Sequence, residues 1–194
     1  MKGRGSVTRR GRTRSLVIMG VTTVIILAVT YVTNRPASGG SLTSIVLSGR
    51  ATGPPPTIGK PAPDFAATTI DGVKTSLRKF RGRPVWLTFG ATWCQPCRAE
   101  APDIEAAYKK HREEGLVVLA VFIREGAAAV KDYTTRVGLT FPRVADTTTQ
   151  IASTYRILGI PTHFFIDRTG VLRATMAGRL DPPTIESAIS GITG

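Results

Sequence analysis

Two apolar runs separated by one predicted helix constrain the fold of this chain more than any other feature. Val85–Gly90 is mostly apolar and contains Trp and Phe, and Leu116–Ile123 is eight apolar residues in succession. Runs of this kind are typical of strands buried on both faces of a sheet. Between them, Pro96–Glu114 has the pattern of a long helix that Gly115 would end. The sequence therefore predicts a strand–helix–strand unit at the centre of an α/β domain.

Shorter elements surround this unit. A single helical turn is expected at 77–80, and Asp146 and Asp181 are the expected N-caps of two later helices. The other predicted elements are strands at 64–69, 73–76, 162–167 and 171–177, and helices at 127–137, 147–155 and from 182 onward. This order of elements predicts an α/β sandwich with a central mixed β-sheet flanked by helices.

The net charge of +13 over 194 residues does not indicate a nucleic-acid partner. Residues 1–14 hold six basic side chains and no acidic one, and residues 15–54 add two more basic ones. More than half of the excess charge therefore lies outside the predicted domain, and no nucleic acid is expected as a partner. With 42% hydrophobic and 20% charged residues, the chain is not intrinsically disordered.

Leu16–Val32 is a run of 17 residues without charge or proline. As a helix it would be about 25 Å long, slightly less than the ~30 Å hydrocarbon core of a membrane. Six basic residues precede the run and only Arg35 follows it closely, so the positive-inside rule keeps the tail in the cytoplasm. We expect a single-pass protein of the cell membrane whose catalytic domain is extracytoplasmic. A cleaved signal peptide remains the alternative, because Ala37-Ser38-Gly39 offers small residues to a signal peptidase.

Four regions follow from these patterns. They are a basic cytoplasmic tail (1–14), a transmembrane signal-anchor (15–33), a flexible linker (34–58) and a folded domain (59–194). The linker prediction rests on Gly39-Gly40, on Pro54-Pro55-Pro56 and on the Ser and Thr residues between them, because such a composition does not bury a core.

Trp93-Cys94-Gln95-Pro96-Cys97 lies where the first buried strand gives way to the long helix. Two sulfur atoms three residues apart in a first helical turn can close a small disulfide ring. The free N–H groups and the positive dipole end of the helix stabilise a thiolate on Cys94. Cys97 lies deeper in the helix and suits the resolving role. The pair therefore predicts thiol–disulfide redox chemistry.

Other uses of the two cysteines fit the sequence less well. A metal site would need two more ligands, and the two histidines, His111 and His163, have no metal-ligand spacing. A purely structural disulfide would gain little, because a two-residue loop closes little entropy. We therefore expect no metal and a redox-active disulfide between Cys94 and Cys97.

The residues around this pair resemble a known family. Positions 93–102, Trp-Cys-Gln-Pro-Cys-Arg-Ala-Glu-Ala-Pro, look like the signature of thioredoxin-fold thiol-disulfide oxidoreductases. The most similar group is the membrane-tethered TlpA/ResA-like one of the AhpC/TSA-redoxin superfamily, and the resemblance spans about residues 58–190. Further matching segments are Pro61-Ala62-Pro63-Asp64-Phe65, Asp71-Gly72, Phe141-Pro142, Asp146, Tyr155, Gly159-Ile160-Pro161-Thr162 and Phe164-Phe165-Ile166-Asp167.

The resemblance implies a thioredoxin-like fold and roles for particular residues. It makes Cys94 the attacking thiol and Cys97 the resolving thiol, and it places the acidic Glu100 near them as a catalytic residue. It also makes Pro161 a cis-proline that faces the pair. The residues that it implies in substrate contact are Trp93, Ile160 and Pro161. The implied partners are disulfide-bearing protein substrates and a membrane thiol electron donor, with no cofactor, and some members of the group serve cytochrome c maturation.

Two positions depart from the family pattern. Thr88 stands six residues before the first cysteine, where ordinary thioredoxin has a buried Asp, so Glu100 or water is the expected proton acceptor. Glu100 is either partly shielded beside the thiols and coupled to them, or a solvated helix carboxylate. His163 follows the cis-proline by two residues, where it could tune the thiolate, shape the substrate groove or have no role. Trp86 is expected to be plain core.

Two alternative functions remain open from the sequence. A peroxiredoxin-like peroxide reductase has Pro and Thr in its catalytic loop where this chain has Leu87 and Ala91. A non-catalytic, partner-binding thioredoxin-like module would bind partners without turning over a disulfide. Between the cysteines, Gln95 carries no charge, whereas strongly oxidising relatives often place His there. We therefore predict an enzyme that reduces disulfides of partner proteins.

Overall fold

The computed structural model describes residues 18–19, 22–23, 26 and 41–194. The chain divides into two compact units, Met1–Ser38 and Gly39–Gly194. In the first unit the described residues are helical, and the hydroxyls of Thr22 and Thr23 donate to backbone carbonyls one turn earlier. Among the described residues, no helix is both long and apolar enough to cross a membrane. The tail predicted at 1–14 and most of the anchor predicted at 15–33 lie outside the described residues.

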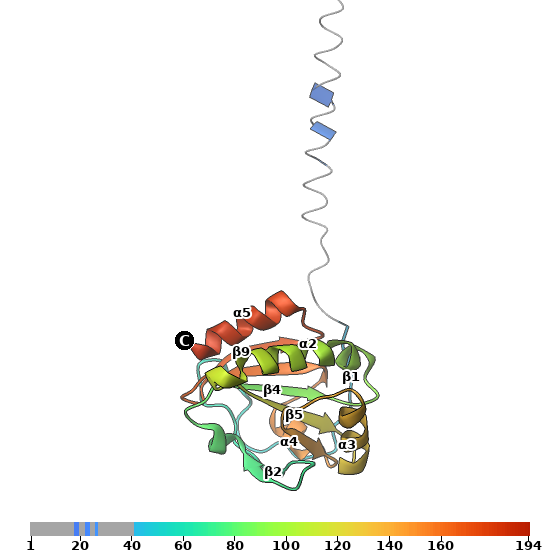
Figure 1. Cartoon of the computed structure of the whole chain (residues 1–194), viewed down its shortest axis with the longest axis vertical. Coiled ribbons are helices and arrows are strands. Elements are labelled where there is room, and N and C mark those ends of the chain that lie inside the picture. Colours follow the sequence, from blue (N-terminus) through green and yellow to red (C-terminus); the bar gives the residue numbers. More distant parts are fainter. Residues whose placement is uncertain (1–17, 20–21, 24–25, 27–40) are drawn as a thin grey trace, which may run out of the picture. The chain divides into compact units, whose positions relative to one another are not determined.

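A five-stranded mixed sheet forms the centre of the second unit (Figure 1). Its strands are β6 (Arg143–Asp146), β5 (Val117–Ile123), β4 (Val85–Gly90), β8 (Thr162–Ile166) and β9 (Leu172–Ala177), in that spatial order. β4 is parallel to β5 and antiparallel to β8. At the edges, β6 runs parallel to β5, and β9 runs antiparallel to β8. The mixed sheet predicted from the order of elements is confirmed.

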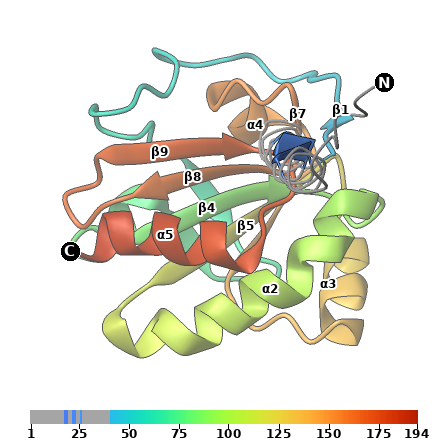
Figure 2. The same cartoon turned by 90° about the horizontal axis from the view of Figure 1, so that it is seen from above.

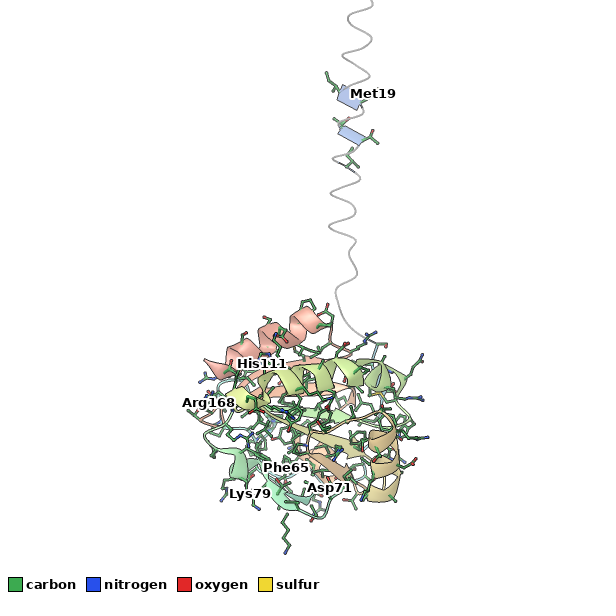
Figure 3. All side chains as sticks on the ribbon, viewed as in Figure 1. Met19, Phe65, Asp71, Lys79, His111 and Arg168 are labelled. Carbon is green, nitrogen blue, oxygen red and sulfur yellow. A yellow bond between two sulfur atoms is a disulfide. The ribbon has the colours of Figure 1, made fainter. Side chains whose placement is uncertain are left out.

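Helices cover both faces of this sheet. α2 (Gln95–His111), α3 (Ala127–Arg136) and α5 (Pro182–Thr193) bury apolar side chains in one core, and α4 (Gln150–Thr154) contributes to the other. Figure 2 shows α2 and α5 on the same side of the strands. Side chains fill the space on both sides of the strands (Figure 3). All seven residues of β5 are buried, as expected for a strand covered on both faces.

The alternation of side chains along β4 divides its residues between the two cores. Leu87 and Phe89 lie in the core on the α4 side, whereas Trp86 lies in the core under α2 and α5. This two-residue period is the ordinary geometry of a strand. It also directs Thr88, which is buried, toward the same side as Trp86.

At its C-terminal end, α2 is tied to α5 by charged groups. The Lys110 ammonium and the His111 ring both contact the Glu186 carboxylate, at 2.7 and 3.1 Å. Burial opposes protonation of the ring, but hydrogen bonds to Glu114 and Glu186 raise the pKa of His111 above its ordinary value. These contacts fix the end of α2 that is farthest from the cysteines; Figure 3 labels His111 there.

Two helix boundaries differ from the predicted ones. The α-helical part of α2 ends at His111, and one 3-10 turn, η2 (Arg112–Glu114), precedes Gly115, whose φ is +97°. α4 begins at Gln150 rather than at 147, because Thr149 adopts a left-handed conformation with φ +59°. Asp146 is therefore not an N-cap in the predicted sense. Its carboxylate instead accepts the N–H of Ala152 at 2.8 Å.

A small ribbon precedes the sheet, close to the predicted positions. β2 (Ala66–Thr68) and β3 (Lys74–Ser76) pair antiparallel and lead into η1 (Leu77–Phe80). The N–H of Gly72 donates to the carbonyl of Thr69 and closes the predicted turn.

Residues 41–54, here called the N-terminal strap, lie along the domain. This differs from the flexible linker predicted at 34–58, of which residues 34–40 lie outside the described residues. Within the strap, β1 (Thr43–Ser44) pairs antiparallel with β7 (Gly159–Ile160). The sequence predicted neither of these two short strands. The N–H of Ile45 continues this pairing by donating to the carbonyl of Leu158 at 3.3 Å.

Side chains about a hundred positions away in the sequence hold the rest of the strap. The Thr149 hydroxyl accepts the N–H groups of Ser48 and Gly49, at 2.9 and 2.8 Å. The Gln150 amide donates to the carbonyl of Arg50 at 2.7 Å. Gly49 also allows a close approach, because a Cβ there would lie 2.6 Å from the carbonyl oxygen of Thr149. Within the described part of the strap, small residues thus allow close contact, and the backbone of Ser48, Gly49 and Arg50 is hydrogen-bonded to the domain.

Gly49→Ala is expected to destabilise the protein by about 1–3 kcal/mol, because the added methyl group meets backbone atoms that cannot move away. Trypsin should then cleave after the exposed Arg50 faster than in the wild type. The matched control is Gly191→Ala, at an open helical position where the same change stabilises by up to about 1 kcal/mol. Equilibrium denaturation and timed proteolysis make the comparison. Equal stability and equal cleavage of Gly49→Ala and wild type would show that the strap is not docked as described.

Candidate active site

The two cysteines lie at the junction between the central strand and the longest helix. β4 ends at Gly90, Cys94 is the N-cap of α2, and Cys97 lies in its first turn. The two sulfur atoms form a disulfide. The sulfur of Cys94 also accepts the N–H of Cys97 at 3.3 Å. The first sulfur therefore lies at the unpaired N–H end of a 17-residue helix, where a thiolate is stabilised.

The burial of the two cysteines is the reverse of the expected order. Cys94 is only 1% exposed, and Cys97, which was expected to lie deeper, is partly exposed. Cys94 belongs to the core cluster that also contains Ala91 and Ile160, so the N-cap position turns its side chain inward. Trp93, the residue before it, is 50% exposed. In the disulfide form, the side chain of Cys94 is therefore shielded from solvent.

The predicted cis-proline is confirmed, because the Ile160–Pro161 peptide bond is cis. The side chains of Ile160 and Pro161 are buried, so of the three residues expected to contact substrate only Trp93 offers an exposed side chain. The backbone of Ile160 is paired with Thr43 of the strap. A substrate strand that approaches this edge of β7 thus meets an edge that β1 already occupies.

Glu100 is buried, with 2% of its surface exposed, so the alternative of a solvated helix carboxylate is wrong. It lies one helical turn after Cys97 on α2. Its Oε2 atom accepts the N–H of Leu180 at 3.3 Å and lies 3.5 Å from Nε2 of His163. Glu100, Cys97 and Thr88 line one cavity of about 30 Å³. The structure therefore brings the carboxylate and the second cysteine to a common space.

His163 joins the sheet to this carboxylate. It is fully buried on β8, directly opposite Thr88 of β4 in the antiparallel register. Its Nδ1 atom lies 3.0 Å from the Thr88 hydroxyl and accepts the indole N–H of Trp86 at 3.3 Å. Trp86 is thus more than the plain core residue that was expected, because it holds one side of the imidazole ring.

Tyr133 of α3 also lines the cavity. Burial is the main cause that raises the pKa of Tyr133 above its ordinary value. The phenol therefore stays neutral over the physiological range. Among the residues that the structure describes, no group of three or more His, Cys, Asp or Glu side chains lies close enough to hold a metal ion.

Comparisons with known proteins agree with this geometry. The pattern of the AhpC/TSA family matches residues 58–175. The chain belongs to the AhpC/TSA family. The thiol-disulfide oxidoreductase ResA of Bacillus thuringiensis subsp. konkukian (strain 97-27) is 35% identical over 136 residues, which cover 70% of this chain and 79% of that protein. ResA of Bacillus subtilis (strain 168) is 32% identical over 122 residues, or 63% of this chain and 68% of that protein.

Solved structures show the same fold for this AhpC/TSA-family chain. A putative thiol:disulfide interchange protein DsbE from Chlorobium tepidum superposes with a TM-score of 0.67 at 29% identity, over 72% of this chain and 99% of that one. StoA from Bacillus subtilis superposes with a TM-score of 0.57 at 27% identity, over 66% and 96% of the two chains. The protein is a thiol-disulfide oxidoreductase with a thioredoxin-like fold, and its Cys94-x-x-Cys97 pair lies at the start of α2.

Sequence reasoning missed one further group beside the disulfide of this AhpC/TSA-family enzyme. The Glu125 carboxylate accepts both the N–H of Thr92, at 2.7 Å, and the Thr92 hydroxyl. It thereby fixes the loop that carries Trp93 into Cys94. The signal available in the sequence was the position of Glu125 just after the second buried strand, whose end lies beside the end of β4 in a parallel sheet.

In the reduced enzyme, Cys94 is expected to react with iodoacetamide about tenfold faster than Cys97 at pH 7. An ordinary thiol is only a few per cent ionised at that pH, whereas a helix N-terminus can bring the ionised fraction to about half. Alkylation rates of Cys97→Ser and Cys94→Ser, each with a single thiol, measure the two sites separately. Equal rates, or faster alkylation at Cys97, would contradict the assignment of Cys94 as the nucleophile. The burial of Cys94 would then control its reactivity more than the helix N-terminus does.

Proposed function

We propose that this protein reduces disulfides of partner proteins outside the cytoplasmic membrane. The observation that carries the proposal is the Cys94–Cys97 pair at the N-terminus of α2, beside the cis-Pro161 bond and a buried carboxylate. Thiolate character at Cys94 suits attack on a disulfide, and the carboxylate suits removal of a proton from the second thiol.

The exchange takes two steps. The Cys94 thiolate attacks one sulfur of the substrate disulfide, an S–S bond forms between enzyme and substrate, and the first substrate thiolate leaves. Cys97 then gives its thiol proton to Glu100, and its sulfur attacks Cys94. The mixed disulfide breaks and the second substrate thiolate leaves. The substrate has gained two electrons, the Cys94–Cys97 disulfide remains, and a thiol donor at the membrane has to reduce it again.

Exposed apolar side chains near Cys94 and around β7 support a protein as substrate. Trp93 is half exposed next to Cys94, and Leu158 is largely exposed next to β7. Leu42 of the strap is also exposed, and it lies 3.5 Å from the position of a Cβ on Gly159. Exposed aromatic and aliphatic side chains of this kind are typical of surfaces that dock another protein.

The proposal also covers the direction of disulfide exchange, the side of the membrane on which the domain lies, and the process that the activity serves. The uncharged Gln95 between the cysteines supports reduction rather than strong oxidation of partners. The basic tail before the uncharged run at 16–32 supports an anchored domain on the outer side of the membrane. The likeness to the TlpA/ResA-like group makes cytochrome c maturation a candidate process for this activity.

Cys97→Ser is expected to accumulate mixed disulfides with partner proteins, because the resolving thiol that releases them is gone. Non-reducing electrophoresis of cells that express the full chain, followed by identification of the adducts, measures this. Cys94→Ser is the matched control and should trap nothing. Absence of adducts in Cys97→Ser, or equal adducts in both variants, would contradict attack by Cys94 on protein disulfides.

Protease added to intact spheroplasts is expected to digest the domain, which should remain with the membrane fraction. Protection of the domain from protease would overturn the proposed orientation. A soluble product that begins near Ser41 would overturn only the retention of the anchor.

Glu100→Gln is expected to slow release of the mixed disulfide and to change the pH dependence of exchange between about pH 5 and 9. The amide keeps an acceptor for the N–H of Leu180, so the fold should stay intact. Glu105→Gln is the matched control. Glu105 is also a buried carboxylate of α2, but it accepts the N–H and hydroxyl of Thr140, away from the cysteines. Superimposable pH profiles for wild type and Glu100→Gln would leave Glu100 without a part in proton transfer.

A further inference from the structure

We infer that His163 is a positioning residue for Glu100, whose carboxylate it holds by an Nε2–H group while the proton of Cys97 is transferred. The inference deepens the proposed function and rests on it. His163 acts through Glu100 and not on the reacting sulfur atoms. This role requires the proton of its ring to be on Nε2, the nitrogen that faces Glu100.

The groups around the ring determine that proton's position. The Trp86 indole N–H can only donate, and it points at Nδ1 from 3.3 Å. Nδ1 must therefore accept, and in a neutral imidazole the proton is then on Nε2. The Thr88 hydroxyl, 3.0 Å from Nδ1, can rotate to donate as well. The ring is thus held in the tautomer that turns a donor toward α2.

Nε2 faces the Glu100 carboxylate. The Nε2–Oε2 distance is 3.5 Å, and within the described part of the chain Nε2 is a buried polar atom without a hydrogen-bond partner. A buried N–H group without an acceptor raises the free energy of the folded protein. Any small movement that brings it closer to an acceptor therefore stabilises the fold. The acceptor in reach is the Glu100 oxygen, which, as far as the described residues go, otherwise receives the N–H of Leu180 alone, at 3.3 Å.

The neighbouring elements place few titratable groups around His163 and Glu100. β4 and β9 place Trp86, Thr88 and Met176 against His163, and none of these titrates. From α2 come Glu100 and Cys97, and from α3 comes Tyr133, which burial keeps neutral. Beyond β9, Arg179 is paired with Asp103 at 3.7 Å near the surface. Among the described residues, His163 is the one side chain with a basic nitrogen within 4 Å of the Glu100 carboxylate.

The same geometry prevents His163 from becoming the proton acceptor itself. A second ring proton would have to occupy Nδ1, where it would face the N–H of Trp86. The proton that leaves the Cys97 thiol therefore goes to Glu100, directly or through one water, for which a cavity of about 30 Å³ has room. His163 donates its Nε2–H toward the carboxylate and holds it in place during the transfer.

Two substitutions of His163 distinguish the role of Nδ1 from the role of Nε2. His163→Asn can keep an acceptor for Trp86 and Thr88 but loses the donor toward Glu100, whereas His163→Gln carries an amide N–H far enough to replace Nε2–H. We measure the two exchange steps separately, from about pH 5 to 9, on the full chain with oxidised glutathione as the disulfide probe. The mixed disulfide formed by attack of Cys94 is followed first, and its resolution by Cys97 is followed second.

In His163→Asn we expect resolution to slow on the order of tenfold, a fraction of what a proton-transfer group contributes, with the acid limb of its pH profile moved to higher pH. The attack step should be unchanged. His163→Gln should restore the wild-type profile. In the Glu100→Gln background, His163→Asn should have no further effect, since the residue acts through Glu100. A purely structural His163 would lower stability in both variants without moving the profile.

Three results would overturn the inference: a wild-type profile in His163→Asn, an equal defect in His163→Gln, or a defect that persists beside Glu100→Gln. If the variants do not fold, nitrogen NMR of the wild type decides the matter through the tautomer. The Nε2–H form supports the inference and the Nδ1–H form overturns it. Failure of the wild type to exchange with glutathione or with any protein disulfide would instead contradict the proposed function, and the two failures are therefore distinct.

Discussion

The antiparallel pairing of β4 with β8 is the contact on which the active site depends. β4 leads into the cysteines, and β8 begins one residue after the cis-proline, so one ladder brings both parts of the site to the same end of the sheet. Its register also places Thr88 opposite His163. A slip of β8 by one residue would turn His163 to the opposite core and separate it from Glu100 and Thr88.

In this protein the buried acidic side chain near the cysteines comes from a helix and not from the central strand. Ordinary thioredoxin carries an acid at the position of Thr88, whereas here the buried carboxylate comes from α2 at Glu100. The hydroxyl of Thr88 contacts the imidazole ring instead. The carboxylate thereby gains a fixed position one helical turn from Cys97 and contacts from two other segments of the chain, at Leu180 and His163. A helix placed over the sheet can supply the group that a central strand lacks.

Much of the site was predictable because its signals are local. The Cys-x-x-Cys motif between an apolar strand and a helix could be placed from a short stretch of sequence, and the resemblance to the family supplied the cis-proline. The strap was missed because Thr149 and Gln150, which hold it, lie about a hundred positions away. The sequence left the burial of Glu100 open between two alternatives, and it missed the contacts of Trp86, because both depend on strand register and helix docking. The inward turn of Cys94 depends on how its N-cap packs against Ile160, which no local pattern shows.

The pairing of β1 with β7 has a mechanical consequence for the enzyme. Thr43 and Ser44 form the first paired segment of the folded unit, and their partners are Gly159 and Ile160, immediately before Pro161. Tension on the chain ahead of Thr43 is therefore carried first by two residue pairs beside the disulfide. So short a ladder detaches long before a five-stranded sheet yields. Pulling on the N-terminal end of this domain would bare the edge of β7 while the rest of the fold stayed intact.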